Sequence, residues 1–266
     1  MSEGSLTRIT VTLVAWLAIA FMVFPVILTA VVSLNASFFI EFPPKALSLQ
    51  WYENIGAIHR IGEATLVSLT VAVASAAVAC LLGLGAALAI ARHPLPGKPV
   101  VTAFLLSPIT VPMVAIGIAL VQFFIAIGAA FTWWSLVVGH IVLVIAYPVR
   151  TLVAALTLSD TSLEDAARSL GASRWRAFRT VTLPQLKPGL VSGFLFAFLI
   201  SFDNYPISVF LVRGDLTTMP IEVFNYISNN FDPTPAAFST VYIVVVSVLI
   251  ALAEWRYRIM SLSIPR

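Results

Sequence analysis

The sequence predicts an all-α membrane protein with six membrane-spanning helices and one structured cytoplasmic segment. Apolar residues make up 60% of the 266 positions and charged residues only 10%, whereas soluble domains have about 45–50% and about 25%. The mean hydropathy is +1.00. So little charge cannot cover a soluble surface, and so much apolar side chain excludes disorder. The single cysteine, Cys80, excludes a disulfide scaffold.

Runs without Asp, Glu, Lys or Arg locate the spans, because crossing a hydrocarbon core of about 30 Å takes about 20 apolar residues in a helix. These runs are Ile9–Ile40, Ala64–Ala91, Pro99–Val149, Pro188–Phe202 and Pro233–Ala253. The third is long enough for two helices joined by a turn near Gly128–Trp134. The fourth is short, and we expect its helix to continue past Asp203 to Val212, which places one acid within a span.

The basic residues predict that the N- and C-termini are both cytoplasmic. With six crossings, only Lys45, Arg60 and Arg213 of the 15 Lys and Arg residues fall outside. This asymmetry follows the positive-inside rule. It also accounts for the net charge of +3, so we expect membrane lipid as a partner and no nucleic acid. The first apolar run is longer than the core of a signal peptide, and we expect it to be retained.

The cytoplasmic segment between the fourth and fifth spans is the only one large enough for its own structure. Its sequence reads LSDTSLEDAARSLGASRWRAFRTVTLPQLKPG. Ser162 or Thr161 is expected to cap a helix over Leu163–Leu170. Glu164 and Asp165 then lie in its first turn, where the helix dipole favours acids.

A bend is predicted after this first helix. Gly171 should end it in the left-handed conformation, and Ser173 should cap a second short helix that runs to about Thr180. Pro184 is expected to prevent any continuation of that second helix. The product is a helix–Gly–helix elbow whose small Ala166 and Ala167 allow another protein to approach closely.

This elbow resembles a motif of the inner-membrane permease subunits of binding-protein-dependent ABC importers. In that family Glu-Ala-Ala is followed by three residues, Gly, nine residues and Ile-x-Leu-Pro. Here Asp165-Ala166-Ala167 is followed at the same spacings by Gly171 and by Val181-Thr182-Leu183-Pro184. Asp165 replaces Glu and Val181 replaces Ile, and Glu164 can share the acidic role.

The resemblance implies the fold of a type I ABC importer permease, with residues 1–266 as a single transmembrane domain and residues 160–184 as its ATPase-coupling segment. The implied coupling residues are Glu164, Asp165, Ala166, Ala167, Gly171, Leu183 and Pro184. The implied partners are a cytoplasmic ABC ATPase dimer, a second permease subunit and a periplasmic or surface solute-binding protein. The implied location is the bacterial inner membrane. Gly83, Ala87 and Ala91, four residues apart, would let another helix approach closely.

The sequence predicts a transport subunit rather than an enzyme. It has no G-x-x-x-x-G-K-[ST] phosphate loop, so we expect no cofactor in this chain and place ATP and magnesium on the partner ATPase. No catalytic or metal-ligating residue is expected, since the required clusters are lacking in the sequence. His140, in the predicted fourth span, is interpreted as a packed or hydrogen-bonded residue rather than a proton relay.

Three residues, Asp203, Asn204 and Tyr205, are predicted to line the substrate pathway. The reason is Asp203, because an acid within a span marks a pathway or a buried pair. A local cap near the outer face is the alternative. Residues 201–206 and 218–221 resemble the spermidine/putrescine-type branch of these permeases, which implies half of a pathway for a polyamine or related small organic cation. That branch also carries phosphonates, opines and thiamine. An ATP-independent secondary transporter is the remaining alternative, and it would need charged groups in several spans.

Overall fold

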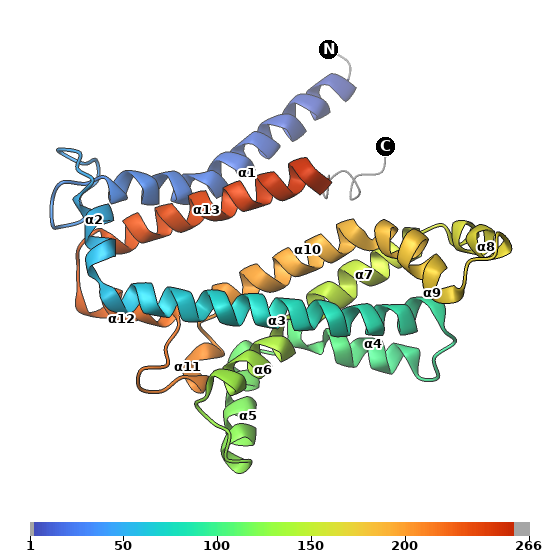
Figure 1. The fold of residues 1–266 in the computed structure, drawn as a ribbon. Helices are drawn as coiled ribbons and strands as arrows, with labels where there is room; N and C mark the ends of the chain where they lie inside the picture. The colour runs from blue at the N-terminus through green and yellow to red at the C-terminus, as the bar shows by residue number, and fades with distance from the viewer. Residues whose placement is uncertain (1–2, 258–266) are drawn as a thin grey trace. The chain divides into compact units, whose positions relative to one another are not determined.

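The computed structural model describes residues 3–257. Within this range the chain forms helices and no strands (Figure 1). Five of these helices are long and apolar enough to cross a membrane, and a bent pair brings the number to six if it counts as one span. This confirms the predicted all-α membrane fold. The predicted cytoplasmic tail beyond Tyr257 lies outside the described residues.

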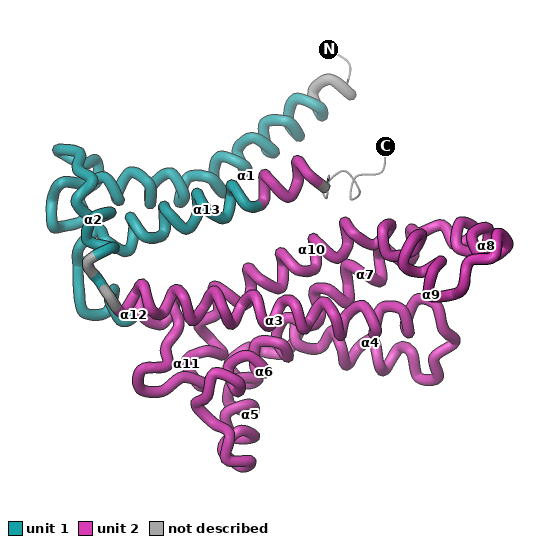
Figure 2. Tube along the Cα trace, viewed as in Figure 1, with its two compact units in different colours: residues 1–59, 223–249 teal, residues 60–222, 250–266 magenta. Residues whose placement is uncertain are grey.

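The chain forms two compact units (Figure 2). Unit 1 comprises residues 1–59 and 223–249, and unit 2 comprises residues 60–222 and 250–266. The elements of unit 1 are α1 (Glu3–Ser33), α2 (Gln50–Ala57), and most of α12 (Met219–Asn229) and α13 (Thr234–Tyr257). Those of unit 2 are α3 (His59–Arg92), α4 (Lys98–Leu106), η1 (Ser107–Ile109), α5 (Met113–Ala126), α6 (Trp133–Val144), α7 (Ala146–Leu158), α8 (Thr161–Ser169), α9 (Arg174–Ala177), η2 (Phe178–Thr182), α10 (Leu183–Phe202) and α11 (Ser208–Leu211).

Helix α1 ends at Ser33, before the end of the charge-free run Ile9–Ile40. The cause is Asn35, whose side chain is fully buried. Its amide donates to the carbonyl of Glu41 at 3.0 Å, and its Oδ1 accepts the backbone N–H of Ser37 at 3.0 Å. Such local bonds from an Asn side chain compete with the helical ladder.

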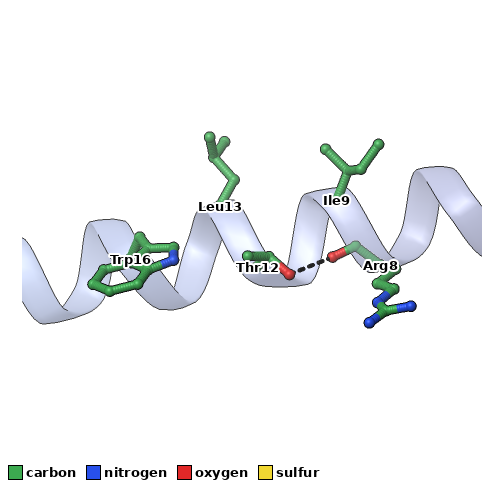
Figure 3. A pocket seen from close by; sticks show the side chains of 5 residues that line it. All are labelled: Arg8, Ile9, Thr12, Leu13 and Trp16. Atoms are coloured by element: carbon green, nitrogen blue, oxygen red, sulfur yellow. Dashed lines mark hydrogen bonds between the residues drawn. The ribbon is translucent and has the colours of Figure 1, made fainter.

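The surface of α1 is exposed throughout its most apolar stretch. A shallow hollow on it is lined by Arg8, Ile9, Thr12, Leu13 and Trp16, all from this one helix (Figure 3). The Thr12 hydroxyl donates to the carbonyl of Arg8 at 2.8 Å within the helix. Apolar side chains on a helix of this length are typical of a surface in contact with lipid or another membrane helix.

Unit 2 is built around α3, α7 and α10. Ala87, Leu152 and Leu186 share one buried cluster between these helices. A Cβ on Gly83 would lie 3.2 Å from the Cβ of Pro148, so α3 and α7 approach closely at the predicted small residue. The contact of α10 with α7 is tighter still, because a Cβ on Gly193 would lie 2.8 Å from the Cα of Pro148.

The third charge-free run holds a break that was not predicted from the sequence. Helices α4 and α5 are bent by 100° across residues 110–112. Pro112 precedes α5, and a proline both lacks an amide hydrogen and disfavours a helical residue before it. The later turn is where it was predicted: Gly128 has φ 70°, and Thr132 caps α6 by accepting the N–H of Ser135 at 3.1 Å.

Candidate functional site: the coupling elbow and the Asp203 turn

Helices α8 and α9 lie at one end of unit 2, and α11 lies towards the other (Figure 1). The cap of α8 is Asp160, whose carboxylate accepts the backbone N–H of Ser162 at 2.8 Å. The predicted cap, Ser162 or Thr161, is therefore wrong by one or two residues. An aspartate cap brings a full negative charge to the helix N-terminus, which the dipole favours. Hydrogen bonding to Ser162 lowers the pKa of Asp160.

The bend of the elbow agrees with the prediction. Gly171 has φ 89°, a left-handed conformation that glycine adopts without a Cβ clash. The N–H of Ala172 reaches back to the carbonyl of Ala167 at 3.1 Å, which closes the end of α8. Ser173 then caps α9 by accepting the N–H of Arg176 at 3.3 Å.

Pro184 does not stop the second helix as predicted. Helix α9 passes through the π-helical turn η2 into α10, so Arg174–Phe202 forms one continuous candidate span. The N–H of Leu183 bonds to the carbonyl of Phe178, five residues back. A π turn changes the hydrogen-bond register, and Pro184 follows it directly, in the first turn of α10.

The outer surface of the elbow combines charges with exposed apolar side chains. The side chain of Asp165 is 74% exposed and only 3.9 Å from the guanidinium of Arg168. Leu170 is 90% exposed and Trp175 is 68% exposed. Ala166 is exposed, Ala167 and Leu183 are half-buried, and Pro184 is exposed. These residues thus form an accessible surface, and their role in coupling stays a prediction.

Glu164 lies differently from its neighbour Asp165, although the two were expected to share one acidic role. Its Oε2 is 3.1 Å from Nη1 of Arg92, at the end of α3. The same oxygen accepts the hydroxyl of Thr182 at 2.7 Å. Glu164 therefore contacts the helices of unit 2, while Asp165 points to the outside.

Asp203 stands at the end of α10 rather than inside a span, which corrects the predicted continuation to Val212. Helix α10 ends at Phe202, and the N–H of Asp203 bonds to the carbonyls of Leu199 and Ser201. The Asp203 side chain is exposed. Since α10 has 20 residues, it is about 30 Å long, and Asp203 lies at the opposite end from the elbow.

The other two predicted pathway residues have different environments. Asn204 is 4% exposed; its Oδ1 accepts the N–H of Ile207 at 3.0 Å, and its amide contacts the sulfur of Met113 at 3.7 Å. Tyr205 is half-buried. Asn204 thus shapes the turn from within, and of the three predicted pathway residues only Asp203 has an exposed side chain.

His140 is buried and hydrogen-bonded, as predicted. Its Nδ1 lies 2.7 Å from the hydroxyl of Ser201, and its Nε2 lies 3.0 Å from that of Ser208. Ser208 donates its single hydrogen to the carbonyl of Asn204. Nε2 must therefore carry the proton that Ser208 accepts, and Nδ1 accepts from Ser201. Neither serine was predicted from the sequence, where their only signal is their polarity within an apolar stretch.

Among residues 3–257 no group of three His, Cys, Asp or Glu side chains is placed to hold a metal ion. Two sets of polar contacts in unit 2 lie at opposite ends of α10, one at the elbow and the other at the Asp203 turn.

Two named relatives are similar to the chain over most of its length. The spermidine/putrescine transport system permease protein PotC of Haemophilus influenzae is 28% identical over 235 residues, which cover 88% of this chain and 91% of PotC. The putrescine transport system permease protein PotI of Escherichia coli is 28% identical over 240 residues, which cover 88% of this chain and 85% of PotI.

The fold is similar to that of a bacterial ABC transporter involved in the import of the acidic polysaccharide alginate. The TM-score is 0.73 with 14% sequence identity, over 96% of this chain and 97% of that one. A chain of the MetNI methionine ABC transporter gives a TM-score of 0.61 with 16% identity, over 79% and 99% of the two chains. A family model described as the binding-protein-dependent transport system inner membrane component matches residues 79–264. Since this match spans more than half of the chain and includes the elbow, the chain belongs to the family of inner-membrane components of binding-protein-dependent transport systems.

Proposed function

We propose that this chain forms half of the transmembrane pathway for a polyamine, or a related small organic cation, in an ATP-driven importer. A solute-binding protein outside the membrane delivers the cargo, and a second permease subunit supplies the other half of the pathway. ATP and magnesium belong to a cytoplasmic ATPase pair. The termini and the elbow face the cytoplasm, in keeping with the positive-inside distribution of Lys and Arg.

The elbow is the surface that docks on the ATPase. Leu163, Leu170 and Trp175 are 50%, 90% and 68% exposed, and burying such side chains at an interface contributes about 25 cal/mol per Å² of apolar area. Gly171 turns α9 away from α8, so both short helices can enter one groove. The exposed Asp165 and Arg168 can select the partner by charge complementarity.

The cargo proposal is carried by one observation, the exposed carboxylate of Asp203 at the C-terminal end of α10. The unpaired carbonyls at this end of a helix carry about half a negative charge, and the carboxylate adds a full one. Both favour a cation. The names of PotC and PotI point to the same class of solute, whereas a phosphonate would be repelled here.

Transport in reconstituted vesicles tests this function. The complex, purified through a tag on this chain, is placed in vesicles with its binding protein and with ATP on the ATPase side. We expect ATP-dependent uptake of radiolabelled putrescine or spermidine that unlabelled polyamine suppresses and methylphosphonate does not. Uptake of a phosphonate instead would overturn the cationic cargo, and uptake of thiamine, itself an organic cation, would overturn only the assignment to a polyamine. Uptake that is as fast without ATP would favour the secondary transporter and overturn the importer.

A further inference from the structure

A cluster of three side chains joins the coupling elbow to the rest of unit 2. Nη1 of Arg92 lies 3.1 Å from Oε2 of Glu164, and its Nη2 donates to the hydroxyl of Ser159 at 3.2 Å. The hydroxyl of Thr182 donates to the same Glu164 oxygen at 2.7 Å. We call Arg92, Glu164 and Thr182 the clamp. Its members come from the end of α3, the first turn of α8 and the π turn that leads into α10.

The clamp is partly shielded from water. The side chains of Arg92 and Glu164 are 23% and 24% exposed, and Thr182 is 2% exposed. Nε of Arg92 is buried without a hydrogen-bond partner, so loss of the carboxylate would leave further unpaired donors beside it. Removing one member of such a pair is costly because the other charge stays behind without compensation.

Apolar packing alone holds α8 weakly. None of its nine residues is buried, whereas α3, α7 and α10 share the buried cluster of Ala87, Leu152 and Leu186. Apart from the chain itself, which joins α8 to α7 and α9, a force on α8 therefore reaches these helices through its polar contacts. Networks of hydrogen bonds and salt bridges between rigid helices can carry coupling between distant sites.

We propose that the clamp is the mechanical link through which movement of α8 displaces α3 and α10 together, with Glu164 as its positioning residue. This inference rests on the proposed function, in which an ATPase moves the elbow. Glu164 and Asp165 then have separate tasks: Asp165 belongs to the docking surface, and Glu164 fixes that surface to the bundle. If the contacts of the clamp were broken, the ATPase would move the elbow without moving the helices of the pathway.

The first test compares uptake per ATP hydrolysed by the complete complex in vesicles. Glu164→Gln should keep the ATPase bound but lower this ratio by roughly five-fold or more, the scale of a typical coupling free energy. Exchanging the two charges, Arg92→Glu with Glu164→Arg, should restore part of the ratio. The matched control is Glu41→Gln, which breaks the exposed Lys45–Glu41 pair at 3.0 Å and should leave the ratio unchanged, since such pairs contribute little.

A merely structural role gives a different result, because fewer complexes would assemble while each assembled complex kept its normal ratio. That outcome, or an unchanged ratio in Glu164→Gln, would overturn the clamp. If the wild-type complex shows no ATP-driven uptake, the proposed function fails instead, so the two failures are distinguishable.

The second test measures the link directly by electron spin resonance in the same complex. Spin labels are attached to cysteines at the exposed Thr161, in α8 but outside the docking residues, and His93, in a Cys80→Ala background. With Glu164 intact we expect one narrow distance distribution, and with Glu164→Gln a broad one. Thr182→Val, which removes one hydrogen bond and keeps both charges, should broaden it less. Equal distributions in all three proteins would contradict the clamp.

Discussion

Nε2 of His140 in α6 lies 3.0 Å from the hydroxyl of Ser208 in α11. Since Ser208 in turn donates to the carbonyl of Asn204, a buried histidine from a separate helix holds both sides of the turn that presents Asp203. The exposed carboxylate is thus positioned from beneath by a fully enclosed polar network. Loss of the histidine should therefore disturb the turn, whereas loss of the carboxylate should leave the turn intact.

Replacing His140 by Ala should destabilise unit 2. The Ser201 hydroxyl would lose its acceptor on the ring, and the Ser208 hydroxyl would lose its donor but keep its bond to Asn204. A buried polar group left unpaired costs about 1–3 kcal/mol. Thermal unfolding of the detergent-solubilised protein measures the change. The control is His93→Ala, because His93 is exposed. Equal melting temperatures for the two variants would contradict the network.

Asp203→Asn should reduce uptake of a cationic solute while the complex still assembles. The amide keeps the size and shape of the side chain but removes the charge beside the end of α10. We expect the rate of uptake to fall roughly ten-fold, which corresponds to a loss of about 1.4 kcal/mol in the binding free energy of the solute. Asp215→Asn, at another exposed acid, is the control. If both variants import polyamine at the wild-type rate, Asp203 does not line the pathway.

Gly171→Ala should weaken association with the ATPase. A Cβ at this position meets no atom within 4 Å, so the substitution causes no steric clash. Its effect comes from the left-handed backbone conformation, which costs a non-glycine residue roughly 1–2 kcal/mol. The amount of ATPase that copurifies with the chain measures the change. Gly56→Ala, which also has open space and has no positive φ, should retain the ATPase fully. A bulky residue at Ala167 should reduce the association as well.

Asp160→Ala should loosen the first turn of α8, because it removes the acceptor for the N–H of Ser162. Amide hydrogen exchange of this segment, measured by mass spectrometry, should become faster. Thr161→Ala should change it little, although the sequence allowed Thr161 as the cap. Slower exchange in Asp160→Ala than in Thr161→Ala would contradict the assignment.

The same cap predicts a pH dependence. The hydrogen bonds to Ser162 lower the pKa of Asp160 in the folded segment, so its carboxylate stabilises the folded form. This contribution is complete above the ordinary value of about 3.9 and is lost as the pH falls through the lowered pKa. Protection of the first turn relative to the Asp160→Ala protein should therefore persist at neutral pH and vanish in strong acid.

Gly193→Ala should destabilise the contact between α10 and α7. Its Cβ would lie 2.8 Å from the Cα of Pro148 and 2.7 Å from the hydroxyl oxygen of Thr151, and forcing extra atoms into a packed site costs about 1–3 kcal/mol. The backbone atom cannot yield as a side chain would. Gly85→Ala, in α3 with open space around it, should be neutral or stabilising. A drop in melting temperature for Gly193→Ala alone is the expected result.

Much of the elbow could be predicted from the sequence because its structure is local. Gly171 and Ser173 act on backbone groups a few residues away, and the predicted bend and cap are present. The error at Pro184 has a local cause too: the prediction assumed that a proline ends a helix, whereas a π turn before it changes the register. Likewise, the bend between α4 and α5 could have been predicted from Pro112 in the sequence.

By itself, the sequence determined that the chain is an all-helical membrane protein, roughly where its spans lie, and that it carries the elbow motif, since hydropathy and short-range turn chemistry are properties of neighbouring residues. Only the tertiary structure decided that Glu164 contacts Arg92 while Asp165 faces outward, and that His140 supports the Asp203 turn. Adjacent residues on a helix point in different directions, and the partners of Glu164 and His140 lie 72 and 68 positions away from them in the chain. Such pairings depend on how the helices pack, which no local pattern specifies.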